Sequence, residues 1–422
     1  MSDCSHCSTG RRDFIKIAFG ASAAAAISGK FLLPTYAATK PEKAKAVILL
    51  WMQGGPSQLD TFDPKPGTET GGPHKAIESK TKGLFLSEHL PRLAQAADRF
   101  SVIRTLFSKD PNHDTARHLL HTGYRVDPTI DHPHLGSLIV KELGTKAEGL
   151  PGCITLGKDP GAGSGYLPAE LAPLLVEKIE NPLEDLKLAK DVTSFRLADR
   201  EKLLWAQNEG FASEHAEDRV ESQRKAYERA FALMRSPHLK AFDISDEKDE
   251  TKKLYGNSPF GRACLMARRL VEAGVRFVEV TLADWDTHSD NFNRTKGLME
   301  QLDPGMSGLL ADLGRRKLLD ETLVICMGEF GRTPRINGGN GRDHWTRAFC
   351  AALAGGGLAG GRVIGRTNAL GTEAQDRPVS VQDLFATIYG QLGVDPSKKY
   401  TSQTGRPIKI LDGGEPVKEI LT

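Results

Sequence analysis

Net charge is almost absent from this sequence of 422 residues, which has 56 Lys and Arg against 54 Asp and Glu. Residues 1–38 hold four of the basic and two of the acidic side chains, so 52 of each sign remain beyond them. Binding to nucleic acid depends on a dense positive field, which a formally neutral chain does not supply. We therefore expect no nucleic acid as the principal partner.

Cysteines, aromatic residues and long apolar runs are also scarce. Only Cys153, Cys264, Cys326 and Cys350 follow residue 38, widely separated and mostly near apolar residues. This pattern predicts buried free thiols, with pairing in an exported protein as the alternative. With 39% hydrophobic and 7% aromatic residues and 43 glycines, the composition is that of a globular protein with many tight loops.

The first 38 residues have the order of a twin-arginine secretory signal. Arg11 and Arg12 precede a mildly apolar, alanine-rich stretch, which ends in small residues at 35–38. Serine, glycine and lysine interrupt that stretch, which argues against a stable transmembrane anchor. We expect export by the twin-arginine route to the periplasm or the extracellular space. The alternative is a basic tail before an ordinary helix.

The rest of the chain alternates short apolar runs with helical patterns. The runs at residues 46–52, 275–282 and 322–327 are too short for typical helices and indicate buried strands. Helical spacing occurs between them, at residues 261–273 and 292–313. This alternation predicts an α/β fold, with a mostly parallel sheet flanked by helices.

Residues 183–240 have the pattern of long, charged amphipathic helices with an apolar stripe. They interrupt the alternation of strands and helices. We therefore expect one α/β domain over residues 39–422, with a helical insertion at about 183–260.

Acidic residues and histidines concentrate in three short runs, at residues 284–288, 328–332 and 341–345. The first two follow predicted strands directly, and loops at the carboxyl ends of strands bind ligands in open α/β sheets. Carboxylates and neutral imidazoles together are ligands for divalent metals. The predicted metal-site residues are Asp284, Asp286, His288, Glu329, Asp343 and His344.

Each run also has a structural interpretation. Asp284 caps the next helix in that alternative, with His288 packed beneath it, and Glu329 pairs with a nearby arginine. Two secondary candidates lie elsewhere: Asp60, in the loop after the first strand, and His113, on a helical run with further histidines. Polar packing explains a histidine cluster on a helix equally well.

Several motifs together resemble a known family. They are at residues 54–66, 267–278, 284–288, 328–334, 341–345 and 383–388. The chain is similar to exported bacterial proteins known only as domain of unknown function 1501, whose fold resembles the sulfatases and alkaline phosphatases. The resemblance extends over nearly all of the chain after the signal. It implies an alkaline-phosphatase-like arrangement of the predicted sheet and helices.

In that wider superfamily, one metal is held by an Asp, a His four residues later and a distant His. Asp284, His288 and His344 match this order. A second metal takes an Asp after the first strand and an adjacent Asp-His after a later strand. This sequence has Gln53 at the first position and Glu329-Phe330 at the second, and phenylalanine cannot ligate a metal.

The nucleophile of the superfamily also has no direct counterpart. Sulfatases mature a Cys or Ser within Cys/Ser-x-Pro-x-Arg, and this string does not occur. Ser57 and Thr61 are the available hydroxyls, and either would need activation by a metal. Ser57 is the catalytic candidate, with capping of a turn after Pro56 as the alternative. Arg332 is the candidate oxyanion or substrate anchor.

The resemblance and the motifs predict an exported metal-dependent hydrolase of phosphate or sulfate esters. The expected cofactor is a divalent metal, namely zinc, manganese or calcium, and the expected substrate is a small-molecule or carbohydrate ester. Glu329 and Asp343 are either ligands or partners of ligands. The alternative is a noncatalytic exported binding protein on the same scaffold, because the second ligand set and the nucleophile string are missing.

Overall fold

The computed structural model describes residues 44–182, 184, 192–212, 217–402 and 404–421, and the predicted signal at 1–38 lies outside them. A nine-stranded sheet forms the centre of the fold. Its strands are β1 (Ala46–Met52), β4 (Phe100–Phe107), β5 (Cys153–Leu156), β6 (Leu174–Val176), β7 (Phe277–Leu282), β8 (Thr322–Met327), β11 (Phe349–Gly355), β12 (Val363–Ile364) and β15 (Val379–Ser380).

Shorter strands form four hairpins. They are β2 (Ala76–Glu78) with β3 (Phe85–Ser87), β9 (Gly331–Arg332) with β10 (His344–Trp345), β13 (Arg366–Thr367) with β14 (Ala374–Asp376), and β16 (Lys399–Thr401) with β17 (Pro407–Lys409).

The helices connect the strands. The α-helices are α2 (Pro91–Gln95), α3 (His113–Thr122), α4 (Leu135–Leu143), α5 (Ser194–Ala212), α6 (Glu217–Arg235), α7 (Asp249–Tyr255), α8 (Pro259–Glu272), α9 (Asn291–Arg315) and α10 (Val381–Gln391). The short 3-10 helices are η1 (Ala97–Arg99), η2 (Ala169–Leu171), η4 (Pro237–Phe242), η5 (Leu319–Glu321) and η6 (Lys418–Ile420).

The sheet is parallel at every described pairing except those of β11. The strand order is β12-β4-β11-β8-β1-β7-β5-β6, with β15 beside β4. β11 runs antiparallel to both β4 and β8, whereas β1 is parallel to its neighbours β7 and β8. The predicted α/β fold with a mostly parallel sheet is confirmed.

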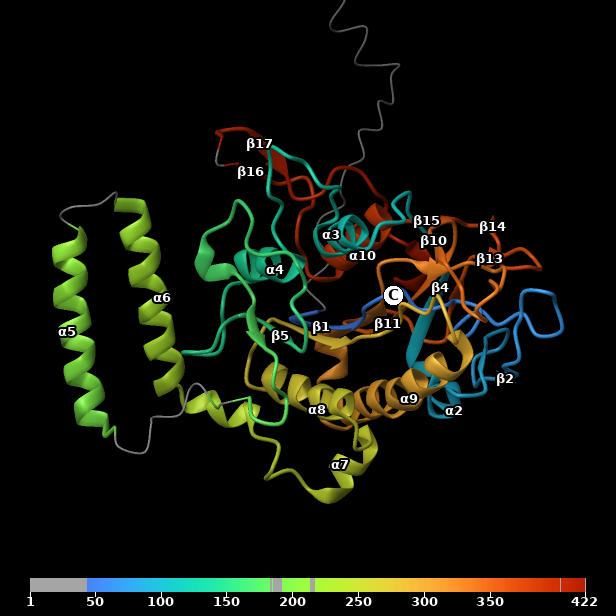
Figure 1. Cartoon of the computed structure of the whole chain (residues 1–422), viewed down its shortest axis with the longest axis horizontal. Helices are drawn as coiled ribbons and strands as arrows, with labels where there is room; N and C mark the ends of the chain where they lie inside the picture. Colours follow the sequence, from blue (N-terminus) through green and yellow to red (C-terminus); the bar gives the residue numbers. More distant parts are fainter. Residues whose placement is uncertain (1–43, 183, 185–191, 213–216, 403, 422) are drawn as a thin grey trace, which may run out of the picture. The chain divides into compact units, whose positions relative to one another are not determined.

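Both faces of the sheet are buried, which explains the continuous apolar runs of its central strands. On β1, Ile48 and Leu50 belong to the core on one side, and Val47 and Leu49 to the core on the other. Helices α8 and α9 cover the first side, and α3, α4 and α10 cover the second (Figure 1). The domain therefore has three layers, with the sheet in the middle.

The segment predicted as a helical insertion contains α5, α6, η4 and α7, between β6 and α8. Leu233 of α6 is buried, and Arg229 donates to the Ala169 carbonyl of η2 at 3.2 Å. No helix among the described residues is long and apolar enough to cross a membrane. The four cysteines beyond residue 38 are buried and unpaired, as predicted.

A charged cluster lies fully buried where β7 meets α3 and α4. Glu279 Oε2 on β7 lies 3.2 Å from His121 Nε2 and 3.2 Å from His134 Nε2. The His134 Nδ1 accepts the Gly136 amide proton, so the proton of its neutral ring is on Nε2 and points at Glu279. His121 Nδ1 instead faces the Arg117 carbonyl at 2.9 Å, to which it donates.

Burial acts to raise the pKa of Glu279, but the charge of His121 and the imidazole hydrogen bonds outweigh it and lower the pKa to about 2. The carboxylate is therefore ionised inside the protein. Because the pKa is depressed, its contribution to stability is present above the unfolded value of about 4.3 and is lost as the pH falls toward 2.

We predict that Glu279→Gln lowers the free energy of unfolding by about 3 kcal/mol near neutral pH, because an amide replaces the carboxylate that two buried imidazoles contact. The difference from the wild type should narrow between about pH 5 and pH 3, where wild-type Glu279 takes up its proton on unfolding. Urea unfolding of both proteins near neutral pH and at about pH 3 measures the two differences in free energy. As control, Glu321→Gln removes an exposed partner of Lys45 and should change stability by less than about 0.5 kcal/mol.

Candidate metal site

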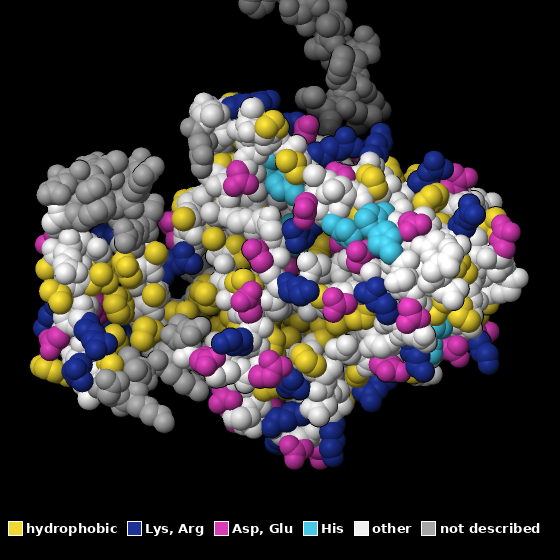
Figure 2. Space-filling view, in the orientation of Figure 1, with side chains coloured by type: hydrophobic (Ala, Val, Ile, Leu, Met, Phe, Trp, Pro, Cys, Tyr) yellow, Lys and Arg dark blue, Asp and Glu magenta, His cyan; other side chains and the backbone are white. Residues whose placement is uncertain are grey.

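The predicted loops meet at one edge of the sheet. Strands β8, β1 and β7 are neighbours and parallel, so the loops at residues 53–55, 284–288 and 328–330 leave from their shared carboxyl-terminal edge. The β9–β10 hairpin adds His344, and α3 adds His113 at its first residue. In Figure 2, histidine side chains form a patch on the visible surface, with acidic side chains beside it.

Three histidines surround one carboxylate oxygen. Asp286 Oδ1 lies 3.2 Å from His288 Nε2, 3.4 Å from His113 Nε2 and 3.5 Å from His344 Nε2. The Nε2 atoms of His288 and His344 are 2.9 Å apart. The side chains of Asp286 and His288 are 45% and 46% exposed, so a small molecule can reach the group from solvent.

Each histidine has its other ring nitrogen held by an acceptor. His113 Nδ1 lies 2.7 Å from Glu329, His288 Nδ1 2.7 Å from Asp343, and His344 Nδ1 2.6 Å from the carbonyl of Pro111. A carboxylate or a carbonyl can only accept, so each Nδ1 carries the proton and each neutral ring keeps its Nε2 lone pair. The ligand atoms of His113, His344 and Asp286 all lie within 4.8 Å of one another, and His288 Nε2 stands beside two of them. Such a convergence of imidazoles and a carboxylate is the arrangement found around protein-bound metals.

The electrostatics of the group agree with this arrangement. Burial acts to raise the pKa of Asp286, but the hydrogen bond and the charge of Arg332 lower it below its usual value. The hydrogen bond to Glu329 raises the pKa of His113, and burial lowers that of His344. The hydrogen bond from His288 lowers the pKa of Asp343. Both aspartates are thus ionised at neutral pH.

Arg332 joins the loops to one another and is itself fully buried. Its Nη2 lies 2.6 Å from Asp286 and also donates to the Gly54 carbonyl. Its Nε donates to the Gly55 carbonyl at 2.9 Å, and its Nη1 to the Arg342 carbonyl at 3.2 Å. With these partners inside the protein, Arg332 orients Asp286 and does not reach outward as a substrate anchor.

Gly54 allows this close approach of the loops. Its φ is +111°, and a Cβ there would overlap the backbone nitrogen of Asp286. Its amide donates to Glu329 Oε1 at 2.9 Å, the same oxygen that holds His113. The loop after β1 thereby orients two groups of the site without supplying a ligand.

Asp60 anchors a second buried arginine. Its Oδ2 accepts from Arg342 Nε at 2.8 Å and from Asn291 Nδ2 at 2.8 Å. Arg342 also donates to the Thr70 carbonyl at 2.8 Å. Because Arg342 immediately precedes Asp343 and His344, Asp60 positions the third run through its contact with Arg342. Its effect on the histidines is therefore indirect.

Two predicted residues lie outside the cluster. The Ser57 side chain is fully buried, and its Oγ accepts the Asp60 amide at 3.3 Å, as a turn cap does. Asp284 has an exposed side chain and a φ of +75°, and its carbonyl accepts from Arg294. The positive φ turns the loop so that Asp286, rather than Asp284, faces the histidines.

The aromatic ring of Phe330 packs beside the histidine cluster. The Phe330 ring lies 4.9 Å from the ring of His113 and 4.6 Å from that of His344, between centroids. Gln53 Oε1 and Glu329 Oε2 are buried and have no hydrogen-bond partner among the described residues.

Sequence reasoning missed Arg342, Asn291 and the Pro111 carbonyl. Arg342 lies within the third run, next to two predicted ligands, so its position was a usable signal. The Pro111 carbonyl carries no side-chain signal at all.

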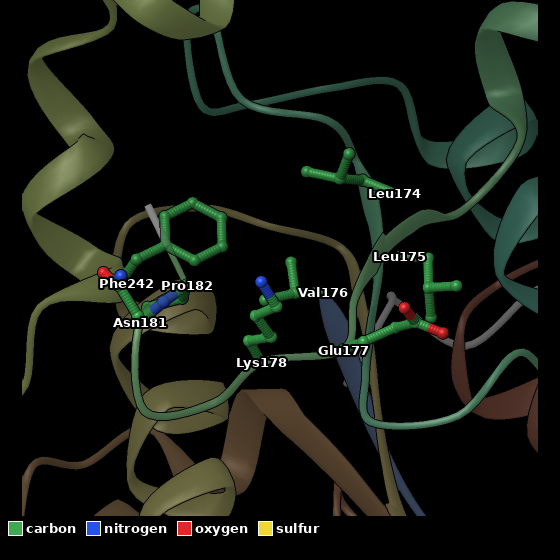
Figure 3. A pocket seen from close by; sticks show the side chains of 8 residues that line it. All are labelled: Leu174, Leu175, Val176, Glu177, Lys178, Asn181, Pro182 and Phe242. Carbon is green, nitrogen blue, oxygen red and sulfur yellow. The ribbon is translucent and has the colours of Figure 1, made fainter. Parts of the chain in front are cut away.

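A separate cavity of about 290 Å³ lies at the edge strand β6, two strands beyond β7 (Figure 3). Its lining of mainly apolar residues, with one Glu and one Lys, lacks the site's histidines.

The profile of the family described as "Protein of unknown function (DUF1501)" matches residues 44–421. No curated protein matches the sequence. Among solved structures, a protein in the alkaline phosphatase superfamily from Vibrio parahaemolyticus is similar at 12% identity and a TM-score of 0.43. The match covers 91% of this chain and 72% of that one.

Two further structures have comparable similarity. The PsFucS1 sulfatase from Pseudoalteromonas sp. has 12% identity and a TM-score of 0.40, over 92% of this chain and 72% of that one. The lipoteichoic acid synthase LtaP from Listeria monocytogenes has 10% identity and a TM-score of 0.40, over 89% and 78%. Similarities this low assign neither an activity nor a substrate to this chain.

We predict that Arg332→Met lowers the free energy of unfolding by about 3 kcal/mol, because it leaves buried carbonyls unpaired and Asp286 without its cation. Thermal and urea unfolding measure the loss. Arg366→Met is the matched control, because it removes an exposed pair with Asp376 and should cost less than about 0.5 kcal/mol. Equal stability of the two variants would contradict the central position of Arg332.

Proposed function

Because this chain belongs to the DUF1501 family of proteins of unknown function, and because three histidine Nε2 atoms converge on Asp286, we propose that it is a metal-dependent hydrolase. The proposed substrates are phosphate or sulfate esters of small molecules or carbohydrates. The convergence of His113, His288 and His344 on Asp286 is the observation that carries this proposal.

The interatomic distances fit a shared ion. Two ligands about 2.0–2.1 Å from a tetrahedral metal lie about 3.3 Å apart. The three distances from Asp286 Oδ1 to the histidine nitrogens, 3.2, 3.4 and 3.5 Å, are close to this value. Three imidazoles with one carboxylate favour zinc or manganese, because calcium takes oxygen ligands.

With His113, His344 and Asp286 as its protein ligands, a divalent ion would keep a fourth position open. There it would polarise an ester oxygen or lower the pKa of a water molecule, and this water would be the nucleophile that no side chain here provides. The residues of the chain prepare this chemistry. Glu329, Asp343 and the Pro111 carbonyl hold the imidazoles in one tautomer, and Arg332 keeps Asp286 ionised and oriented. Ser57 has no role in this scheme.

The proposed centre holds one metal. Phe330 packs against two of the histidines where the superfamily has a ligand, and Gln53 offers only an amide oxygen. The transition state would therefore be stabilised by a single ion, with the neighbouring apolar ring restricting the space beside it. This favours a water nucleophile over a two-metal mechanism with a covalent intermediate.

A noncatalytic binding protein is the second candidate. The buried Ser57 and the missing second set of ligands favour it, because the superfamily's route through a hydroxyl nucleophile is closed. Under either function we propose export, because the first 38 residues have the order of a twin-arginine signal. That route and a periplasmic or extracellular location follow from the sequence alone.

The test compares two aspartates of one loop. Asp286→Asn should lose the ion of this centre and the turnover of nitrophenyl phosphate and nitrophenyl sulfate, because it removes the negative charge and one oxygen of the carboxylate on which the histidines converge. Asp284→Asn is the matched control, with an exposed side chain outside the cluster, and should keep both. Metal content by plasma mass spectrometry and steady-state assays provide the measurements.

The outcomes separate the alternatives. Bound metal without turnover of either ester would favour the binding protein. If Asp284→Asn loses the metal and Asp286→Asn keeps it, the assignment of Asp286 is wrong. Protein that takes up no divalent ion at all would overturn the proposal.

A graded effect is expected from Asp343→Asn. This substitution keeps the side-chain volume but weakens the hydrogen bond that orients His288, so the metal affinity of this centre should fall roughly 10- to 100-fold while the centre still binds its ion. Competition with a chromophoric chelator measures the change. Asp412→Asn, on an exposed aspartate that pairs with Lys409, should leave the affinity unchanged.

A further inference from the structure

A second histidine pair lies at the open end of the β2–β3 hairpin. The antiparallel register places Ala76 opposite Ser87, and continuing it places Lys75 opposite Glu88 and His74 opposite His89. The Lys75 and Glu88 backbones exchange a hydrogen bond, Glu88 N to Lys75 O at 2.9 Å, so the register holds beyond the strands. Directly opposite residues have their Cβ atoms about 5 Å apart, so the two imidazoles must meet.

The polar atoms of this pair face each other. His89 Nε2 lies 3.2 Å from His74 Nδ1, which is close to the distance of about 3.3 Å between two nitrogens on a tetrahedral ion. The Glu88 carboxylate lies beside them, and the three ligand atoms are within 4.8 Å of one another. One Glu88 oxygen accepts the Lys75 amide proton at 2.9 Å, which holds the carboxylate at this position.

The surroundings keep the pair ready to ligate. All three side chains are half-buried, and the His74 ring packs edge-on against Phe292 of α9 at 5.6 Å between centroids. The nitrogens that would ligate an ion, His74 Nδ1 and His89 Nε2, are the two that already face each other.

We propose that His74, His89 and Glu88 form a second metal site, separate from the cluster at Asp286, for a divalent transition ion such as zinc or cobalt. Two imidazoles and a carboxylate are the donors that such ions take, and water completes the coordination. The assignment rests on the hairpin register and on the distances among the three side chains. It does not depend on the proposed hydrolase activity.

The position of this site gives it a structural consequence. His74 packs on Phe292, and the preceding residue Asn291 donates to Asp60 and accepts from Thr287 in the loop of Asp286. An ion bound by both His74 and His89 would fix the open end of the hairpin next to the start of α9. It would thereby stabilise Asn291, which contacts the loop of Asp286 through Thr287.

The experiment counts bound ions. The full chain, stripped with a chelator, is titrated with Co²⁺, and visible absorption and metal content are read for each variant. His89→Ala should lose one Co²⁺ per chain relative to the wild type, and Asp286→Asn should lose a different one, so that the double variant loses both. His238→Ala, a histidine of η4 outside the three side chains, is the control and should lose none.

Glu88→Gln provides a second variant at a partly exposed position, where folding is not at risk, and should weaken the same Co²⁺ site. Circular dichroism verifies the fold of each variant. If His89→Ala and Glu88→Gln bind as much Co²⁺ as the wild type, the two imidazoles share only a hydrogen bond and the proposal is overturned. If Asp286→Asn loses no ion while His89→Ala loses one, the hydrolase centre fails and this second site stands.

Discussion

The candidate site depends on one buried guanidinium. Arg332 is fully buried and contacts the carbonyls of the loop after β1, the carboxylate of Asp286 after β7 and the carbonyl of Arg342 before His344. These segments come from different parts of the chain, and their peptide oxygens would otherwise face one another without a donor. A planar cation with several N–H donors satisfies them together, which a lysine at this position could not do.

The central strands, and the meeting of their loops at one edge of the sheet, were predictable from the sequence. Buried parallel strands appear as continuous apolar runs, and their carboxyl ends lie at the same edge. The apolar runs at 46–52 and 322–327 agree with β1 and β8. The detailed ligand geometry was not predictable. The positive φ at Asp284 orients the loop so that Asp286 faces the histidines. His113 comes from α3, which is distant in sequence. Such features depend on the packing of distant segments, which local pattern does not encode.

Phe330 shows how one side chain changes the chemistry that a scaffold can support. Its apolar ring contacts the rings of His113 and His344 and offers no ligand atom to an ion. The buried oxygens of Gln53 and Glu329 have no hydrogen-bond partner among the described residues.

The buried cluster of Glu279 with His121 joins the same two elements that meet in the exposed site. β7 carries Glu279 and leads to Asp286, while α3 carries His121 about two turns beyond His113. A single contact between a helix and a strand leaves the helix free to pivot about it. Two contacts along its length fix its direction. The orientation of the His113 ring therefore depends on a buried contact, between Glu279 and His121, that lies away from the exposed site.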